Sequence, residues 1–269
     1  MNATAESIRL QLTPELRYLL RIADTCLVHA QRLAEWCGHA PVLEEDIALS
    51  NMALDLLGQA RGLLTHAAHL AGPDLDEDRL AFLRDERDYL NLTLVEQPLR
   101  RSSGHAPGGD FADTVLRNFL LSTWLKTLWA RLAGSSDSTL AAIAGKALKE
   151  ARYHQQHAAD WVVRLGDGSA ESARRMQAAL QRAWPYTHEM FADDAVDAAA
   201  QACGLGPARG ALQAAWLGEV DAVLAQAQLA APAATPFIST GTQGRHSEHL
   251  GYLLAEMQSL QRQHPAGRW

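Results

Sequence analysis

The residues with the clearest potential for chemistry are carboxylates and histidines at helical spacing in segments otherwise rich in Ala and Leu. Glu150, His154 and His157 follow one another at steps of four and three, which places them on one side of a helix. Carboxylate oxygens and imidazole nitrogens are ligands that suit iron. The pattern could form a mononuclear metal site, although three polar groups on the outer side of an amphipathic helix are the more common case.

Three other pairs stand at short spacing: His66 and His69, His246 and His249, and Cys37 and His39. Each histidine pair more often marks a polar helix face or a capped loop than a ligand set. The Cys and His of the third pair lie at an expected helix end, where packing or capping is a more common role than nucleophilic catalysis. The sequence contains neither a Gly-rich phosphate loop after a strand nor a G-x-S-x-G motif.

The composition favours an all-α protein. The chain has 269 residues, of which 48% are hydrophobic, mostly Ala and Leu, which are strong helix formers. The formal net charge of -7 argues against nucleic acid or an anionic membrane surface as the main partner. Three cysteines without metal-binding spacing predict a reduced, cytoplasmic protein. We see no signal peptide and no apolar stretch long enough to span a membrane.

The apolar residues recur at three- and four-residue steps and predict a series of helices. Their expected ranges are 14–36, 44–70, 76–92, 110–133, 137–165, 170–191, 194–203, 208–229 and 247–264. Pro185 is expected to kink or split the sixth helix. The charged stretch 84–89 is expected to face solvent on one side. Residues 97–109 and 230–244 read as loops.

The order of these helices predicts the architecture. Two long helices precede the 97–109 loop and two follow it, so two helical hairpins joined by a crossover would form a four-helix bundle of the ferritin type. We expect a single ferritin-like domain over residues 1–269, with the core bundle at about 13–166. A C-terminal helical extension, at about 167–269, would pack outside it.

Ferritin-like bundles often hold two iron ions with one Glu from each of two helices and a Glu-x-x-His motif from each of the other two. The first long helix offers only Asp24, and the second offers Asp55, with Gly58 where the histidine belongs. The helix at 110–133 has no carboxylate near its middle. This half of the pattern is therefore broken.

The second Glu-x-x-His motif is broken as well. Tyr153 stands three residues after Glu150, and His154 comes one residue late, about 100° further around the helix. We interpret the remaining residues as a degenerate metal site in which hydrogen bonds, or a cation such as Lys126 or Arg61, replace the metal. Its members are Asp24, Asp55, Glu150 and His154.

Several motifs in a fixed order resemble one family: EWCGHAP at 35–41, LDLLGQAR at 54–61, LAFLRDER at 80–87, LVEQP at 94–98, FADT at 111–114, KEARYH at 149–154, EHLG at 248–251 and LAEMQ at 254–258. Together they resemble the structural C subunits of bacterial phenylacetyl-CoA epoxidases. These enzymes are multicomponent monooxygenases of phenylacetate catabolism. The resemblance extends from about residue 14 to residue 269.

This resemblance implies a ferritin-like, non-catalytic subunit of a cytoplasmic hetero-oligomer. Its partner would be a related catalytic A subunit with a di-iron centre, which epoxidises the aromatic ring of phenylacetyl-CoA. A small B subunit would join the assembly, and a reductase with flavin and an iron–sulfur cluster would supply electrons from NADPH. No cofactor and no metal are expected in this chain itself.

The resemblance also implies contact with the CoA arm of the substrate near the interface with the A subunit. The candidate contact residues are Asp88, Tyr89, Leu90 and Asn91, followed by Ala198, Ala199 and Ala200. The first two long helices, expected at 14–36 and 44–70, carry more apolar side chains than the core of one bundle needs. We therefore expect the chain alone to self-associate or to be less stable than its complex.

Two other functions remain open from the residues alone. The chain could be an active di-iron or mononuclear metal oxygenase that uses the four residues of the degenerate site. It could also be a ferritin-like storage or stress protein, although the ligands that such a protein needs are missing.

Overall fold

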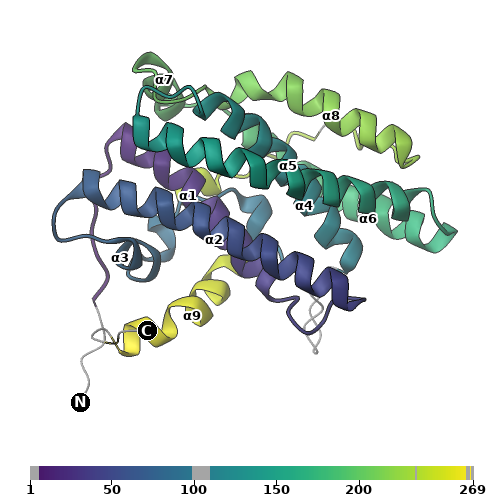
Figure 1. Ribbon diagram of the computed structural model, residues 1–269, viewed down its shortest axis with the longest axis horizontal. Coiled ribbons are helices and arrows are strands. Elements are labelled where there is room, and N and C mark those ends of the chain that lie inside the picture. The colour runs from purple at the N-terminus through teal and green to yellow at the C-terminus, as the bar shows by residue number, and fades with distance from the viewer. Residues whose placement is uncertain (1–5, 99–109, 234, 265–266, 268–269) are drawn as a thin grey trace.

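Two antiparallel helical hairpins form the centre of the structure, a computed structural model that describes residues 6–98, 110–233, 235–264 and 267. The first hairpin consists of α1 (Pro14–Ala34) and α2 (Leu43–Ala71), and the second of α4 (Phe111–Leu132) and α5 (Ser138–Gly166). Figure 1 shows α2 and α5 crossing the front of the molecule. The all-α, ferritin-like fold predicted from the sequence is therefore confirmed, and no strand occurs among the described residues.

The long helices begin where the sequence supplies caps. The Thr13 hydroxyl accepts a hydrogen bond from the backbone N–H of Leu16 at 3.2 Å, and Pro14 occupies the first helical position. Asp110 caps α4 in a capping box with Asp113. These caps fix the helix starts within a few residues of the expected ones.

Helix α1 lies in the middle of the fold. Residues 18–30 are all buried, so every side of this helix is covered by protein. Its broadest contact is with α2, and α7 (Ala195–Ala202) and the 3₁₀ helix η2 (Thr93–Glu96) cover other sides. Any polar residue on α1 must therefore find its partner inside the protein.

The expected helix at 76–92 is wrong over most of its length. The structure has a short α3 (Glu77–Phe82) and then a single-turn 3₁₀ helix, η1 (Glu86–Asp88), before η2. Arg84 and Tyr89, which we expected in a partly solvated stretch, are completely buried. The chain leaves the helical path because both side chains point inward.

The C-terminal half forms further helices around the bundle: α6 (Ala170–Thr187), η3 (His188–Phe191), α7 (Ala195–Ala202), η4 (Arg209–Leu212), α8 (Gln213–Gln226), η5 (Gly241–Gln243) and α9 (Glu248–Gln263). Helices α6 and α8 pack on α4 and α5, and α9 lies beside α3, below the bundle in the view of Figure 1. Pro185 lies inside α6, which continues to Thr187 and is not split. Within the described ranges, no helix combines the length and apolar character needed to cross a membrane.

Two buried glutamates hold the segment between α8 and α9 against the crossover. The Glu96 carboxylate accepts hydrogen bonds from the Asn91 amide at 2.9 Å and from the backbone N–H of Ser247 at 2.7 Å, and the His246 ring lies at 2.6 Å. Burial acts to lower the pKa of His246, but its hydrogen bond to Glu96 outweighs burial and the pKa is raised. This cluster attaches the start of α9 to η2.

The second glutamate, Glu189 in η3, binds three donors from two other segments. It accepts hydrogen bonds from the backbone N–H of Thr93 at 3.0 Å, the Ser239 hydroxyl at 2.7 Å and the backbone N–H of Thr242 at 2.8 Å. Residues 230–244 were expected to be a loop, and the described part of this segment, 230–233 and 235–244, is not helical apart from η5. This loop is fixed in place by buried carboxylates.

The close approach of the C-terminal ends of α5 and α8 can be tested with two glycines of α5. A Cβ atom at Gly166 would lie 2.4 Å from the carbonyl oxygen of Ala227, whereas one at Gly145 would meet nothing within 4 Å. We expect Gly166→Ala to lower the free energy of unfolding by about 1–3 kcal/mol. Gly145→Ala should raise it by about 0.5–1 kcal/mol, and urea unfolding of both variants measures the difference. Equal effects of the two substitutions would contradict this packing.

Candidate functional site

The Asp24 carboxylate is buried in α1 and is neutralised by Arg84, which is itself buried. Both guanidinium Nη atoms bind the carboxylate, one of them at 2.9 Å, and the backbone N–H of Leu90 adds a hydrogen bond of 2.8 Å. The guanidinium also donates to the carbonyl oxygen of Asp88 at 3.0 Å and lies 4.3 Å from the centre of the Tyr89 ring. Asp24 therefore has a full set of partners without a metal.

The cation that balances Asp24 is not one of the two that we expected. Lys126 pairs with Glu219 on α8, and Arg61 pairs with Glu77 at 3.2 Å. The sequence interpretation placed Arg84 in a solvated stretch and so missed its role. A bidentate arginine suits this position because its fork matches both carboxylate oxygens.

The other members of the expected degenerate site form pairs between α2 and α5. His154 Nε2 lies 3.0 Å from the Asp55 carboxylate. The Glu150 carboxylate accepts a hydrogen bond of 3.0 Å from Gln59 and lies 3.5 Å from Lys146. Burial lowers the pKa of His154, and the hydrogen bond with Asp55 opposes that shift. The four residues therefore belong to separate pairs and do not converge on one point.

The buried faces of α2 and α5 also differ from the register that we assumed. Gly58 and Tyr153, at the positions expected for the lost histidines, are both exposed. The buried side chains with polar groups near the middle of these helices are Gln59 and His154. The interior register is thus shifted by one residue, which sequence spacing alone did not decide.

The interior contains polar residues that the sequence analysis missed. The His29 ring lies 3.3 Å from the Asn118 amide oxygen, and the Asn118 amide nitrogen lies 3.2 Å from the sulfur of Met52. The Cys26 thiol lies 3.7 Å from the Gln59 side-chain oxygen. The spacing of Cys26 and His29, three residues apart on α1, was the available signal. They lie on the other side of this helix from Asp24, since two residues correspond to about 200°.

These donors do not fit a di-iron centre. Over the ranges that the structure describes, no three His, Cys, Asp or Glu side chains lie close enough together to hold a metal ion. The positions that face the interior carry an amide, a thioether and a thiol, together with single histidines. Iron in such bundles requires several carboxylates and two histidines around one point. The observed arrangement instead forms hydrogen-bonded pairs across helices.

The other His and Cys pairs singled out in the sequence also make contacts that hold the fold together. His66 lies 2.6 Å from the helix-capping Asp137, and His246 binds Glu96. The His39 ring lies 2.9 Å from the backbone oxygen of Cys37, so this histidine contacts the carbonyl group of that residue. None of these contacts brings a nucleophile and a base together.

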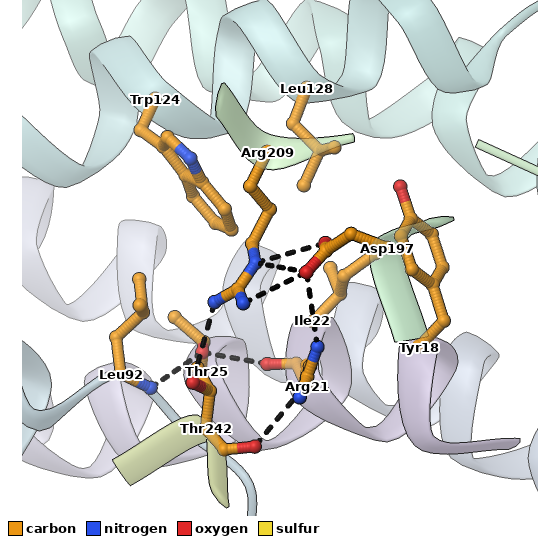
Figure 2. A pocket seen from close by; sticks show the side chains of 10 residues that line it. All are labelled: Tyr18, Arg21, Ile22, Thr25, Leu92, Trp124, Leu128, Asp197, Arg209 and Thr242. Carbon is orange, nitrogen blue, oxygen red and sulfur yellow. Dashed lines mark hydrogen bonds and ion pairs between the residues drawn. The ribbon is translucent and has the colours of Figure 1, made fainter. Parts of the chain in front are cut away.

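A second charged cluster joins α1, α7 and the loop before α9. Figure 2 shows Arg209 and Arg21 converging on the buried carboxylate of Asp197, with Thr242 beside them. Arg209 Nη2 lies 2.9 Å and Arg21 Nη1 3.4 Å from Asp197, and Arg21 Nε donates to the carbonyl oxygen of Thr242 at 3.1 Å. The remaining space of about 10 Å³ is at the lower limit for one water molecule. The cluster is therefore a cross-link, not a ligand pocket.

The two stretches expected to contact CoA lie beside these charged clusters. In the first stretch, Asp88 is half-buried, whereas Tyr89, Leu90 and Asn91 are buried. In the second, on α7, Ala198 is exposed and its two successors are half-buried (Ala199) and buried (Ala200). The CoA contact stays a prediction. In this chain it depends mainly on Asp88 and Ala198, the most accessible residue of each stretch, and on backbone atoms.

Comparison with known proteins gives the family. The family described as Phenylacetic acid catabolic protein matches residues 1–269. The chain belongs to this family. It is 48% identical over 252 residues to a protein of Escherichia coli (strain K12) that is named as the C subunit of 1,2-phenylacetyl-CoA epoxidase, and this match covers 94% of the chain and 98% of that protein. The resemblance seen in the short motifs is therefore confirmed.

In this member of the phenylacetic acid catabolic family, the buried Asp24–Arg84 pair should be a main determinant of stability. Asp24→Asn or Arg84→Met leaves one buried group without its partner, and we expect each to lower the free energy of unfolding by about 3–5 kcal/mol. The double variant should lose less than the sum of the two. The matched control is Arg61→Gln at the exposed Arg61–Glu77 pair, with an expected cost below about 1 kcal/mol. Denaturant unfolding of the wild-type chain, the two single variants and the double variant gives the coupling energy, and a value near zero would contradict the arrangement.

His29 predicts a specific pH dependence of stability. Burial, followed by the nearby charge of Arg117, lowers the pKa of this histidine to about 3 in the folded protein. The unfolded chain binds a proton near the ordinary pKa of about 6.5, so stability is lost as the pH falls below that value. When the pH falls from 7 to 5, we expect the free energy of unfolding of His29→Gln to decrease by about 2 kcal/mol less than that of the wild-type chain.

The measurement is urea unfolding at both pH values. The matched control is His69→Gln, because His69 is exposed on α2. An identical pH dependence in the His29 variant and the wild-type chain would show that His29 is not held neutral in the fold.

Proposed function

We propose that the chain is a non-catalytic subunit of a phenylacetyl-CoA epoxidase complex. The observation that carries this proposal is the 48% identity, over almost the whole of both chains, to a protein named as the C subunit of such an epoxidase. The interior of the bundle supports the non-catalytic role, because its polar side chains bind one another in pairs. A bundle of this kind preserves the helix faces of a ferritin-like enzyme without its ligand set.

The proposal distributes the chemistry over other chains. A catalytic A subunit would hold the di-iron centre and epoxidise the aromatic ring of phenylacetyl-CoA. A reductase with flavin and an iron–sulfur cluster would deliver electrons from NADPH, and a small B subunit would complete the assembly. This chain would contribute a docking surface and contact the CoA arm near the interface. The unpaired cysteines fit the cytoplasmic location that we propose for it.

A stripe of exposed apolar side chains on α2 supports the expected docking. Leu43, Ile47, Leu54 and Leu57 return to the same side of this helix at 100° per residue, and their exposed fractions are 72%, 53%, 65% and 42%. We refer to these four residues as the α2 apolar face. Stable interfaces need a contiguous apolar centre, and large aliphatic side chains exposed on one helix face are rare in monomers. The same face would explain self-association of the isolated chain.

Co-expression with the candidate catalytic subunit tests this proposal. The wild-type chain should copurify with that subunit, and epoxidation of phenylacetyl-CoA by the assembled components should fall when this chain is left out. Ile47→Glu with Leu54→Glu should reduce copurification at least tenfold, because two buried charges at the centre of the interface are unpaired. The matched control is Tyr252→Glu, which changes another exposed residue, on α9.

Two outcomes would overturn the proposal. The first is about two iron ions per purified chain with oxygen-dependent turnover by the chain alone, which would make it an active oxygenase. The second is a monodisperse monomer whose thermal stability does not change when the catalytic subunit is added. Copurification that survives the double substitution would show instead that docking uses a different face.

A further inference from the structure

A large pocket outside the bundle interior is lined by an unusual number of arginines. It has a volume of about 670 Å³ and lies between η2, α4, α6 and the start of α9. Arg117 of α4 and three arginines of α6, namely Arg174, Arg175 and Arg182, contribute to its lining. We refer to it as the arginine pocket. None of the residues discussed for the degenerate site contributes to it.

Arg117 lies at the buried end of this pocket and lacks a counter-ion. Only 4% of its surface is exposed, and no carboxylate in the described part of the chain forms an ion pair with it. Within the described residues, its two Nη atoms donate to the carbonyl oxygens of Val95 and Pro98, each at 3.4 Å. Burial, together with the nearby charge of Arg32, lowers its pKa to about 9. The side chain is thus still charged at neutral pH, and its charge is poorly balanced.

A second donor in the pocket is also unsatisfied. Gln97 contributes to the lining, and its side-chain nitrogen is buried and has no hydrogen-bond partner within the described ranges. A buried amide donor without an acceptor costs free energy comparable to a lost hydrogen bond. Arg117 of α4 and Gln97 at the end of the crossover therefore both present N–H groups that could donate hydrogen bonds to an anion.

The arginines of α6 lie closer to solvent, and a bound anion could replace the carboxylates with which they pair. Arg182 binds Asp113 with two hydrogen bonds of 2.9 Å. Arg174 and Arg175 share Glu171, which lies just outside the pocket lining, at 2.9 and 2.7 Å, and Arg175 also lies 3.5 Å from Asp110. The side chains of Arg182 and Arg175 are 57% and 53% exposed, so these ion pairs hold little free energy. The lining carries four arginines against only these two aspartates.

The acids whose charge acts on Arg117 are Asp113 and Glu35, neither of which forms an ion pair with it in the described part of the chain, and the neighbouring segment 99–109 adds no acid. Residues 99–109 connect Pro98 to Asp110, both of which line the pocket. These eleven residues include two arginines and no Asp or Glu. The excess positive charge of the pocket therefore does not depend on where that segment lies.

From these observations we infer that the arginine pocket binds a small molecule through a phosphate group. The phosphoryl oxygens accept hydrogen bonds from Arg117 and Gln97, and the fork of an exposed arginine closes over them. The pocket is several times larger than one phosphate, and its wall includes the half-buried ring of Tyr186 and the side chain of Leu94. It therefore has room for a non-phosphate part, as in a nucleotide or a coenzyme A. This inference goes beyond the proposed function and does not depend on it.

Calorimetric titration of the full-length chain with inorganic pyrophosphate, at low ionic strength, tests the phosphate site itself. We expect measurable binding that weakens steeply with added salt. Arg175→Gln together with Arg182→Gln should weaken binding about tenfold, since each charge-assisted hydrogen bond contributes strongly. Gln97→Leu should weaken it to a smaller extent. Arg117→Gln should abolish binding, and circular dichroism of that variant shows whether it folds.

The matched control is Arg152→Gln, which removes an exposed arginine of α5 that lies outside the pocket. Parallel titrations with coenzyme A and with dephospho-coenzyme A show whether the bound phosphate belongs to that molecule or to another source. Failure of pyrophosphate to bind at millimolar concentration would overturn the inference. So would equal weakening by Arg152→Gln and the Arg175/Arg182 pair, because that result means unspecific attraction. These outcomes are independent of whether the chain copurifies with a catalytic subunit.

Discussion

The rest of the structure depends on the requirement that a buried charge must have a partner, and the Asp24–Arg84 pair meets it at the centre of the fold. Helix α1 is covered on all sides, so its carboxylate can be balanced only by another segment. Arg84 reaches it because the crossover leaves the helical path after α3. The ion pair attaches residues 83–92, which follow α3, to α1.

The same requirement orders the C-terminal half. Three more buried carboxylates, those of Glu96, Glu189 and Asp197, each bind donors from at least two segments that are distant in the sequence. Together they fix the loop before α9 to η2 and α1. The contacts of Ser239, Thr242, His246 and Ser247 with Glu189 and Glu96 attach this segment to the bundle. The extension is therefore joined to the bundle by polar cross-links as well as by apolar packing.

The sequence predicted the parts of this fold that depend on local signals. Helical periodicity and the two loops indicated the helix order and the ferritin-like arrangement. The partners of Asp24 were not predictable, because the pairing of residues 60 positions apart depends on the tertiary fold. Charge was a misleading guide at Arg84, since charged residues are usually exposed. The interior positions of α2 and α5 were predicted one residue away from the observed ones, because spacing does not reveal which side of a helix faces its partner.

The polar and apolar groups of this chain bear on two separate questions: whether the interior could bind a metal, and where the outside could bind a partner or a ligand. In the bundle interior, carboxylates and histidines bind one another across helices, which leaves no converging set for a metal among the described residues. Among the described residues, single buried polar atoms without a partner also occur in the interior, such as His29 Nδ1 and the indole nitrogens of Trp124 and Trp129. The larger surfaces without a partner are the α2 apolar face and the surroundings of Arg117. Apolar surface and unbalanced positive charge are both costly in a chain that works alone. Their presence supports the proposal that this chain acts through what it binds, since binding is where its free energy can still be lowered.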